Sequence, residues 1–472
     1  MKLLIAGYNL DSSLIDSLKL SNASPEVISA AYARISRSSK SVNLLREEAL
    51  NEVEKARKSN ENIIFEMGHA SVAEHAVFNL DLIDISRLLT ETVQRSRLAS
   101  FTEKSQRYVT FGRDFVVPEE LNKKPKLKKA YKDIMKQLFG LYEDSFKALC
   151  EHYEKHRPEL KPRARESLAK EDARYILPLA TKTQMGMTIN ARSLENLLRR
   201  LAHSPLCEAH ELKELIFNAV KPITPSLIRH VEPDGYAGQI NLDSVGFCDF
   251  LQQELPWLAE IDLANKACTI SASPNADDKV LAALIYSQGE LSWHENLDTV
   301  SRLPKMAKEQ LWQQVFKGMR AWHKVPRAFE AAEFEFELSM SESCWAQFKR
   351  HRQCTLLKKG GYPGLSIIPP VIKEIGHLKD WEQAIKRCTL LADSMPDSLQ
   401  YLREYLKLNT TPCKIYAKMN LREIYHFVRL RSDEHAQWEI RSVSDAICKK
   451  VKLEAPQASR LLCGKSDFKQ IY

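Results

Sequence analysis

The chain contains the same arginine-rich stretch twice. The first, Glu91–Val109, reads ETVQRSRLASFTEKSQRYV, and Arg95 opens its Arg-Ser-Arg triplet. The second, Gln347–Thr355, repeats the spacing with an Arg-His-Arg triplet that Arg350 opens, 255 residues further on (350 − 95). A repeat at this distance predicts two copies of one fold in tandem, with the two stretches as their corresponding centres.

The arginines of the first copy suit a phosphate group. Apolar residues from Ile85 to Val93 have helical spacing, so the triplet falls at a helix end. The segment Ser100–Arg107 then reads as a loop that offers hydroxyls and one more guanidinium. A solvated basic helix end is the alternative, and the second copy of the stretch favours phosphate binding.

Periodicity predicts similar elements in both halves. The first half is expected to hold a strand within Met1–Leu10, helices from Pro25 to Ile35 and over 43–58, a strand over 78–82, a long helix over 118–154 and a helix from Asn190. The second half is expected to hold strands near 267–271 and 334–338 and helices over 280–286, over 344–352 and from Asn420. Turn-rich Pro233–Gly238 indicates a boundary. We therefore expect units at 1–235 and 265–472, joined by a linker at 236–264.

The composition indicates a globular cytoplasmic protein. A length of 472 residues exceeds what one core usually supports. The net charge of +8 is spread along the chain and fits an anionic small substrate as well as nucleic acid. Because the lysine run over 123–129 reads as a solvated helix face, no nucleic-acid partner is expected. The ten cysteines include no CxxC pair, which favours free thiols in a reducing compartment. The opening 14 residues read as too short for a signal peptide or membrane span.

The ordered motifs resemble the flavin-dependent thymidylate synthases. The first copy carries Gly-His-x-Ser-x-x-Glu-His at Gly68–His75 and the loop ending in Ser-x-Arg-Tyr at Tyr108. The second carries Arg-His-Arg from Arg350 and Leu-Arg…His-Ala-Gln-Trp-Glu-Ile over 430–440. The resemblance covers nearly the whole chain. It implies an α+β fold present twice, each copy a mixed sheet with flanking long helices. It also implies a homodimer that forms a pseudo-tetramer, because the family usually works as a tetramer of single units.

Each copy departs from the family where the other does not. In the first, Ser96 replaces the histidine of the triplet, Thr92 replaces a glutamine, and Leu201 or Arg200 stands where an arginine belongs. The second keeps Gln347, His351 and Arg431 but has lost the phosphate loop, with Lys358, Gly360 and Tyr362 at its key positions. Since family sites lie between units, one composite site is expected to be complete. The rival interpretation is independent decay of both copies.

The resemblance assigns roles to residues of this chain. Arg431 is expected to activate the pyrimidine. The expected substrate-binding residues are Gln347, Arg350, Glu103, Ser105, Gln106, Arg107 and Arg174. The expected FAD-binding residues are His69, Ser71, Glu74, Arg95, Arg97, Asn190, Arg192, Asn196, Arg350, His351, Arg352, Asn420, Arg422 and His426. His69, Glu74 and His75 would make an incomplete metal site, so no metal is expected.

The implied reaction is the reductive methylation of dUMP to dTMP, with FAD as cofactor and methylenetetrahydrofolate and NADPH as co-substrates. An arginine beside uracil N3 favours the ionised pyrimidine electrostatically. A nucleophilic cysteine is not expected, since neither Cys207 nor Cys413 has the Pro-Cys-His surroundings of the folate-and-cysteine class. Two alternatives stay open: an FAD- and folate-dependent change to another pyrimidine nucleotide, and a catalytically inactive nucleotide-binding scaffold or regulator.

Overall fold

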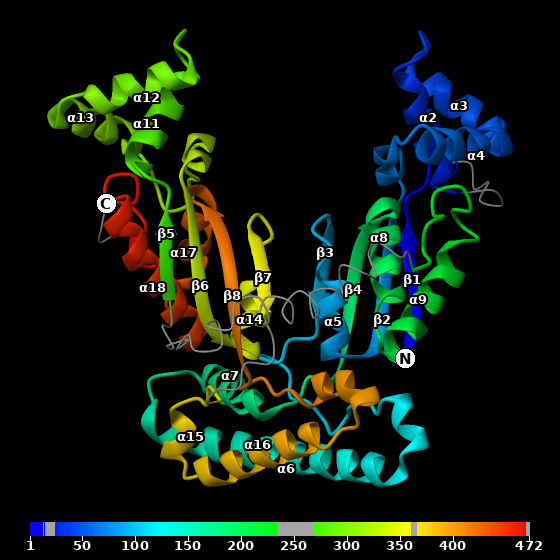
Figure 1. Ribbon diagram of the computed structural model, residues 1–472, viewed down its shortest axis with the longest axis vertical. Coiled ribbons are helices and arrows are strands. Elements are labelled where there is room, and N and C mark those ends of the chain that lie inside the picture. The colour runs from blue at the N-terminus through cyan, green and yellow to red at the C-terminus, as the bar shows by residue number, and fades with distance from the viewer. Residues whose placement is uncertain (13, 15–23, 234–267, 360–365, 469–472) are drawn as a thin grey trace, which may run out of the picture. The chain divides into compact units, whose positions relative to one another are not determined.

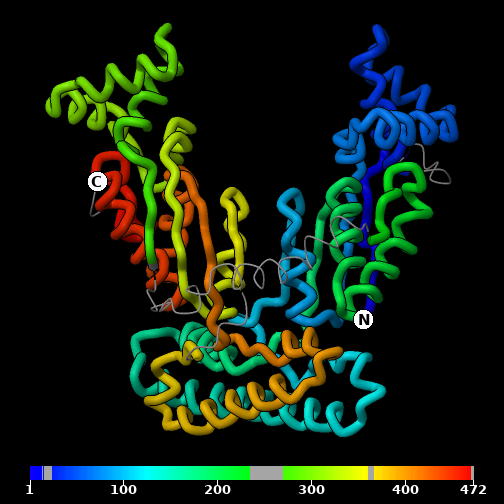
Figure 2. Tube along the Cα trace, in the orientation of Figure 1, coloured from blue at the N-terminus to red at the C-terminus, as the bar shows by residue number. Residues whose placement is uncertain are grey.

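The computed structural model describes residues 1–12, 14, 24–233, 268–359 and 366–468 (Figures 1 and 2). The predicted linker at 236–264 and the loop positions Gly360 and Tyr362 lie outside these residues. The predicted boundaries of the sequence units therefore stay predictions.

The first sequence copy forms four strands and a series of helices, with η marking 3-10 and π turns. They are β1 (Lys2–Tyr8), α2 (Glu26–Ile35), α3 (Val42–Asn51), α4 (Val53–Glu61), η1 (Asn62–Glu66), η2 (Ala70–His75), β2 (Val77–Ser86), α5 (Arg87–Val93), β3 (Ala99–Glu103), η3 (Glu119–Lys123), α6 (Pro125–His156), α7 (Pro162–Ala173), η4 (Arg174–Ile176), β4 (Lys182–Asn190), α8 (Ala191–Ala202) and α9 (Cys207–Val220).

The second sequence copy repeats the order of strands and α-helices among its described residues, with fewer 3-10 and π turns. Its elements are β5 (Cys268–Ala272), α11 (Ala276–Tyr286), α12 (Trp293–Arg302), α13 (Lys305–Phe316), η6 (Arg327–Ala331), β6 (Glu333–Ser341), α14 (Glu342–Phe348), β7 (Thr355–Lys359), α15 (Val371–Glu374), α16 (Leu378–Asp393), η7 (Asp397–Leu406), β8 (Pro412–Asn420), α17 (Leu421–Arg431) and α18 (Trp438–Glu454).

The two sheets have the same topology. The strand orders are β1-β2-β4-β3 and β5-β6-β8-β7, and the outer end of the central pair matches, since Val77 pairs with Asn190 and Glu333 with Asn420. The predicted α+β fold in two copies is confirmed. One detail is corrected: every described strand pair is antiparallel, so the sheets are not mixed. Each described strand runs opposite to every strand that it pairs with.

A bulge in β2 sets the alignment of the copies. Asp84 has φ +60° where the β2–β4 register shifts, whereas β6 and β8 pair without a shift. Before the bulge, Phe78 corresponds to Phe334, 256 residues on (334 − 78); after it, Ser86 corresponds to Ser341, 255 on (341 − 86). The extra residue in β2 therefore accounts for the change of one residue between the aligned blocks.

Each sheet buries one face. Along β4 and β6, alternate side chains are fully buried, as expected for antiparallel strands with one face against a core. In the first copy the buried face packs with α8 and α9, including Leu194 and Ile216. In the second, α17 and α18 supply Phe427 and Ile447 in the same way.

Most predicted helices and strands are present, and several segments differ. The long helix predicted over 118–154 begins at Pro125, after the separate 3-10 helix η3. The helix predicted over 43–58 is two helices, α3 and α4, separated at Glu52, whose φ of −127° is not helical. The predicted loop Ser100–Arg107 begins as strand β3, because its backbone pairs with β4 from Ala99 to Glu103. Both arginine triplets lie just beyond the end of a helix, α5 or α14. This agrees with the prediction for the first triplet, whereas the helix predicted over 344–352 ends at Phe348 and leaves the second triplet outside it.

The compact units do not follow the sequence copies. The first compact unit comprises described residues within 1–261 and also 370–408, which come from the second copy. In this unit α16 lies beside α6 (Figure 1). The buried hydroxyl of Ser145 accepts a bond of 2.9 Å from Trp381 Nε1 and lies 3.0 Å from His377 Nδ1. Helix α6 of the first copy thus packs at Ser145 against helix α16 of the second copy.

Corresponding residues of the two copies pair with each other in this unit. Pro178 and Leu408, 230 residues apart (408 − 178), form an antiparallel bridge. This is the offset between the helix caps Asn190 and Asn420 (420 − 190). Leu179 N donates to Lys407 O at 2.7 Å beside the bridge. The arrangement is that of a twofold contact, in which a patch meets its own equivalent.

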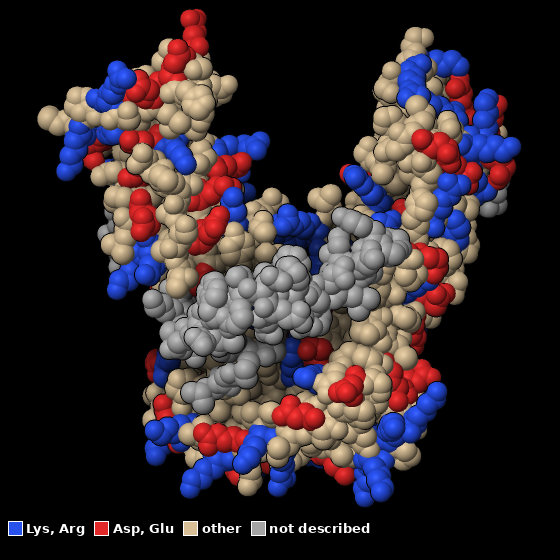
Figure 3. All heavy atoms as spheres, viewed as in Figure 1, with Lys and Arg blue, Asp and Glu red and all other residues tan. Residues whose placement is uncertain are grey.

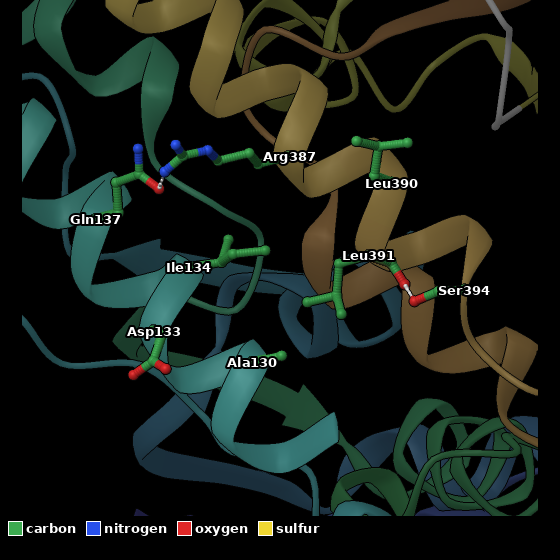
Figure 4. A pocket seen from close by; sticks show the side chains of 8 residues that line it. All are labelled: Ala130, Asp133, Ile134, Gln137, Arg387, Leu390, Leu391 and Ser394. Atoms are coloured by element: carbon green, nitrogen blue, oxygen red, sulfur yellow. Dashed lines mark hydrogen bonds between the residues drawn. The ribbon is translucent and has the colours of Figure 1, made fainter. Parts of the chain in front are cut away.

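A shallow groove runs between α6 and α16 (Figure 4). Its volume is about 690 Å³, and Arg387 Nη1 donates to Gln137 Oε1 at 3.1 Å across it. None of the predicted site residues lines the groove. Over this helical layer, basic and acidic side chains are interspersed on the face seen in Figure 3, and Lys123, Lys126 and Lys129 are exposed, in agreement with a solvated helix face.

Replacing Tyr405 with phenylalanine tests the packing of segment 370–408. Its hydroxyl donates to Glu208 Oε2 at 2.6 Å in a buried site, where burial raises the pKa of Glu208. Losing this bond is expected to lower the free energy of unfolding by about 1–3 kcal/mol, measured by urea denaturation. Tyr401→Phe is the control, because no hydrogen bond joins its hydroxyl to the described residues. Equal losses in the two variants would contradict the assignment.

Candidate functional site

A buried carboxylate fixes the helix that leads to each arginine triplet. Ser86 caps α5 by accepting from Leu89 N, and its own N and Oγ donate to Glu208 at 2.6 and 2.7 Å. Ser341 caps α14 in the same way, and its N and Oγ donate to Glu439 at 2.7 and 2.5 Å. The capping serine is thus held from both sides, which sets where each short helix begins.

Three second-copy side chains form a chain of contacts at the end of α14. Arg431 Nε donates to His351 Nε2 at 3.1 Å, and His351 Nδ1 lies 3.3 Å from Glu423 Oε1. A histidine that accepts at Nε2 carries its proton on Nδ1, so Glu423 accepts from His351. The carboxylate therefore fixes the imidazole, and the imidazole orients the guanidinium of Arg431.

Burial favours the neutral form of this histidine. His351 is 4% exposed. Burial lowers its pKa, Glu423 opposes the shift, and the charges of Arg431 and His426 add to it. A neutral imidazole is the form that can accept from Arg431, so the electrostatics and the hydrogen bonds agree.

Gln347 completes this cluster. Its carbonyl O accepts from Arg431 Nη2 at 3.2 Å, and its side-chain Nε2 lies 3.4 Å from Gln437 Oε1. Its Oε1 is buried and has no hydrogen-bond partner among the described residues. A buried acceptor of this kind suits a ligand that brings an N–H or O–H donor. The structure thus joins predicted Gln347, His351 and Arg431 in one cluster.

The first copy lacks all three members of the Glu423–His351–Arg431 chain. At the corresponding positions it has Ser193 (423 − 230), Ser96 (351 − 255) and Leu201 (431 − 230). Leu201 is fully buried in the core beneath the sheet. The first copy has therefore lost all three side chains that contact one another in the second copy.

The predicted phosphate clamp of the first copy is also connected. Arg107 Nε donates to Glu171 Oε2, at 2.5 Å, and Arg174 Nε donates to the carbonyl O of Glu171 at 3.2 Å. Arg107 N donates to Ser105 Oγ at 3.2 Å. Burial lowers the pKa of Arg174, and the neighbouring charge of Arg107 lowers it further. Glu171 thus holds one guanidinium through its carboxylate and the other through its backbone carbonyl, and two guanidiniums close together suit a phosphate group.

Glu103 has partners outside this clamp. It lies 3.6 Å from Arg87 Nε and accepts from Gln94 Nε2 at 2.9 Å. At the corresponding positions of the second copy the charges are reversed, with Lys358 Nζ donating to Glu342 at 2.6 Å. Such a swapped pair is typical of a structural contact between helix and strand. The substrate role of Glu103 stays a prediction.

In each copy, the segment before the central strand contacts the helix that begins after Asn190 or Asn420. Arg192 donates to Glu74 at 2.6 Å, and Arg422 donates to Glu330 at 3.0 Å. Glu330 corresponds to Glu74 only in the 256-residue register (330 − 74). Asn190 and Asn420 each cap the following helix by accepting from the third residue on, Ser193 or Glu423.

The other predicted cofactor residues lie on the surface or near it. The exposed side chains are His69, Ser71, Arg95, Arg97, Asn196, Arg350 and His426. Arg352 is partly buried, as is Gln106, which is predicted to bind substrate. The His426 ring lies 5.7 Å from that of His351. Arg95 and Arg350 form no ion pair with the described residues, and exposed guanidiniums without acid partners suit the diphosphate of a flavin nucleotide.

A hollow of about 270 Å³ marks the outer face of the first sheet. Its lining includes Ser100, Asn79 and Thr188 around Gly186, whose missing side chain leaves the space open. The corresponding residue of the second sheet is Tyr416 (416 − 186 = 230), beside the ion pair between Lys418 and Glu333 at 2.8 Å. The outer faces of the two sheets have thus diverged. Ser100 faces this hollow and has no described bond to the Arg107 clamp.

Sequence reasoning missed several residues that hold the site together. Glu423, Glu171 and Glu330 are carboxylates that contact a predicted histidine or arginine, and Glu208 and Glu439 hold the helix-capping serines Ser86 and Ser341. The signal for Glu423 was its replacement by Ser193 together with the loss of His351 and Arg431. The described residues contain no group of three or more side chains arranged to hold a metal. Among these residues no helix is both long and apolar enough to span a bilayer.

Stability is expected to depend on His351 at acidic pH. Its pKa in the folded protein lies below the usual 6.5, so the unfolded chain binds the proton first as pH falls. The stabilisation is present above about pH 6.5 and is lost as pH falls through the lower folded value. Wild type should therefore lose more unfolding free energy than His351→Gln between about pH 7 and 5, measured by urea titration. Parallel losses would contradict the buried neutral histidine.

The comparisons with known proteins agree on one family. The sequence pattern of "Thymidylate synthase complementing protein" matches residues 16–226 and again 270–457. The chain is similar to UPF0159 protein Ta1429 of Thermoplasma acidophilum, 23% identical over 85% of this chain and 87% of that protein. It is also similar to a flavin-dependent thymidylate synthase of Clostridium tetani, 30% identical over 36% of this chain and 69% of that one.

A solved structure of Thymidylate Synthase X from Helicobacter pylori with FAD and dUMP is 22% identical and covers 49% of this chain and 99% of that one. Its TM-score of 0.30 is too low to add to the assignment. The two separate matches, the repeated strand order and the paired motifs have one explanation: the chain belongs to the thymidylate synthase complementing protein family, as two tandem copies.

Proposed function

We propose that this protein catalyses the FAD-dependent reductive methylation of dUMP to dTMP, with methylenetetrahydrofolate and NADPH as co-substrates. The proposal is supported by the observation that each copy has a group of site residues that the other copy lacks. The Glu423–His351–Arg431 chain exists only in the second copy, and the clamp of Arg107 and Arg174 lies in the first. A composite site would combine one copy's base-polarising group with the other's phosphate clamp.

Arg431 is proposed to polarise the uracil ring. A guanidinium directed at N3 and its neighbouring carbonyl stabilises the ring's negative charge, which raises the nucleophilicity of C5. Glu423 and His351 support this by holding one edge of the guanidinium in a fixed direction. The buried Oε1 of Gln347 would accept a hydrogen bond from the nucleotide, and Arg350 would lie beside it.

The phosphate of dUMP is proposed to bind at the clamp. Arg107 and Arg174 would provide charge-assisted hydrogen bonds, while Ser105 and Gln106 would provide neutral donors. Glu171 keeps the two arginines together without ligand and reduces their repulsion. When dUMP binds, its phosphate would take over from Glu171 as the negative partner of the arginines. Binding would therefore depend on the charge of the ligand.

FAD is proposed to bind donor side chains of both copies, and when bound it would supply the hydride. The proposed holding residues are His69, Ser71, Glu74, Arg95, Arg97, Asn190, Arg192, Asn196, Arg350, His351, Arg352, Asn420, Arg422 and His426. Arg192 and Arg422 are each held by a carboxylate, Glu74 or Glu330, so they would be oriented before any ligand arrives. We further propose that two chains associate as a homodimer.

Purified protein is expected to bind at least one FAD per chain, and dUMP should perturb the flavin absorbance. Visible absorbance against protein concentration, with and without dUMP, measures both. Flavin without a response to dUMP would favour another pyrimidine nucleotide as substrate. No flavin, even after FAD is added, would contradict the proposed enzyme.

Substitutions in the two copies should separate chemistry from binding. Arg431→Ala is expected to lower kcat about 100-fold or more, because a preorganised charge on the reacting ring is lost. Arg107→Ala is expected to weaken dUMP binding about tenfold or more, because a charge-assisted phosphate contact is lost. Steady-state dTMP formation and dUMP titration measure the effects. Unchanged turnover in Arg431→Ala would contradict its role.

Mixing the two variants locates the composite site. Turnover is measured at a dUMP concentration well below the KM of Arg107→Ala, where sites of that variant contribute little. If one site combines residues of two chains, a mixed dimer holds one intact site, and a co-refolded equal mixture should regain roughly a quarter of wild-type turnover. If the site forms within one chain, every site in the mixture carries a substitution and turnover stays below that of Arg107→Ala alone. The double variant Arg107→Ala/Arg431→Ala is the control, and it should stay inactive in either case.

A further inference from the structure

The first copy carries an arginine one position away from the lost one. Since α8 and α17 start at caps 230 residues apart (420 − 190), Arg200 corresponds to Leu430 and Leu201 to Arg431. Leu201 is fully buried, whereas Leu430 is 47% exposed. The Leu-Arg order of the second copy has thus become Arg-Leu in the first, which keeps a leucine for the core and a guanidinium nearby.

Arg200 reaches the position that Arg431 reaches in the second copy. Its Nη2 donates to Ser96 Oγ at 2.5 Å, and Ser96 corresponds to His351, the acceptor of Arg431. The two arginines therefore meet corresponding residues at the end of α5 or α14 from adjacent helix positions. A residue with no role would not be expected to restore this contact.

The surroundings of Arg200 contain a cation and no counter-charge. Its Nε is buried without a hydrogen-bond partner among the described residues. Burial and the charge of Arg95 lower the pKa of Arg200 to about 10, so it stays charged at neutral pH. Neither arginine forms an ion pair with the described residues. A desolvated cation beside a second cation is costly unless an anion joins them.

The adjacent arginine shows the difference. Arg199 lies 4.0 Å from Glu195, and its Nε donates to His230 O at 3.2 Å. It is held by partners that its own copy supplies, as expected for a structural arginine. Arg200, on the same turn of α8, has one neutral partner and a repulsive neighbour.

We propose that Arg200, Arg95 and the hydroxyl of Ser96 form a second anion site, which binds a phosphoryl group of a nucleotide. Two guanidiniums and a hydroxyl present several donors to one cluster of phosphate oxygens. All three residues belong to the first copy and lie at the ends of α5 and α8. The inference rests on the proposed function in one respect, since Arg95 is also among the residues proposed to hold FAD, and it adds Arg200 and Ser96. The site is separate from the proposed catalytic one, because Leu201 replaces the polarising arginine and Ser96 replaces its histidine. It binds without reacting.

The test is titration of the full-length protein with inorganic phosphate, pyrophosphate and FAD by calorimetry. Arg200→Leu restores the residue of the second copy, and Arg199→Leu removes an equal charge from the next position. In an Arg107→Ala background, which weakens the clamp, Arg200→Leu should bind the anion about tenfold or more weakly than its parent. Arg199→Leu should bind as its parent does.

The probes separate the sources of the phosphoryl group. A loss of FAD binding in Arg200→Leu would identify a flavin diphosphate, and a loss confined to phosphate or pyrophosphate would identify a smaller anion. Equal binding of all three probes by parent and Arg200→Leu would overturn the proposal. Arg200→Gln serves as a second variant should the leucine impair folding. Because no turnover is measured, failure of the proposed reaction would leave this result unaffected.

Discussion

The structure depends on a buried carboxylate that holds the start of a short helix. Glu208 and Glu439 each accept from the backbone and hydroxyl of a capping serine far away in sequence. The serine ends a central strand and begins the helix that leads to an arginine triplet. Because the carboxylate is desolvated, it is satisfied only when strand, cap and distant helix are all in place. The position of the arginines is thus a product of folding as a whole.

The features that the two copies share maintain the fold, whereas the features that differ are side chains proposed to contact substrate. Strand order, caps, buried carboxylates and the Arg192–Glu74 and Arg422–Glu330 pairs occur twice. The Glu423–His351–Arg431 chain and the Arg107 clamp each occur once. A random loss would remove single residues from connected groups. Here whole connected groups are present or absent, as expected under the division of labour that we propose.

The sequence predicted the fold class, the duplication and most of the helices, because these depend on local periodicity and on repeated motifs. It did not predict β3, since a hydroxyl-rich segment becomes a strand only through pairing with β4. It also missed Glu330, because one bulged residue at Asp84 shifts the register between copies. The supporting carboxylates escaped notice because ordinary surface glutamates have the same local pattern.

The pairing of Pro178 with Leu408 has a consequence for how such a protein can evolve. In a homodimer every substitution at a twofold contact appears on both sides, so neither side can change alone. Here the contact joins two different stretches of one gene product, and dilution cannot separate them. Each side is free to mutate independently while its partner stays at high local concentration. Covalent fusion of the copies thus permits the asymmetry seen in their arginines.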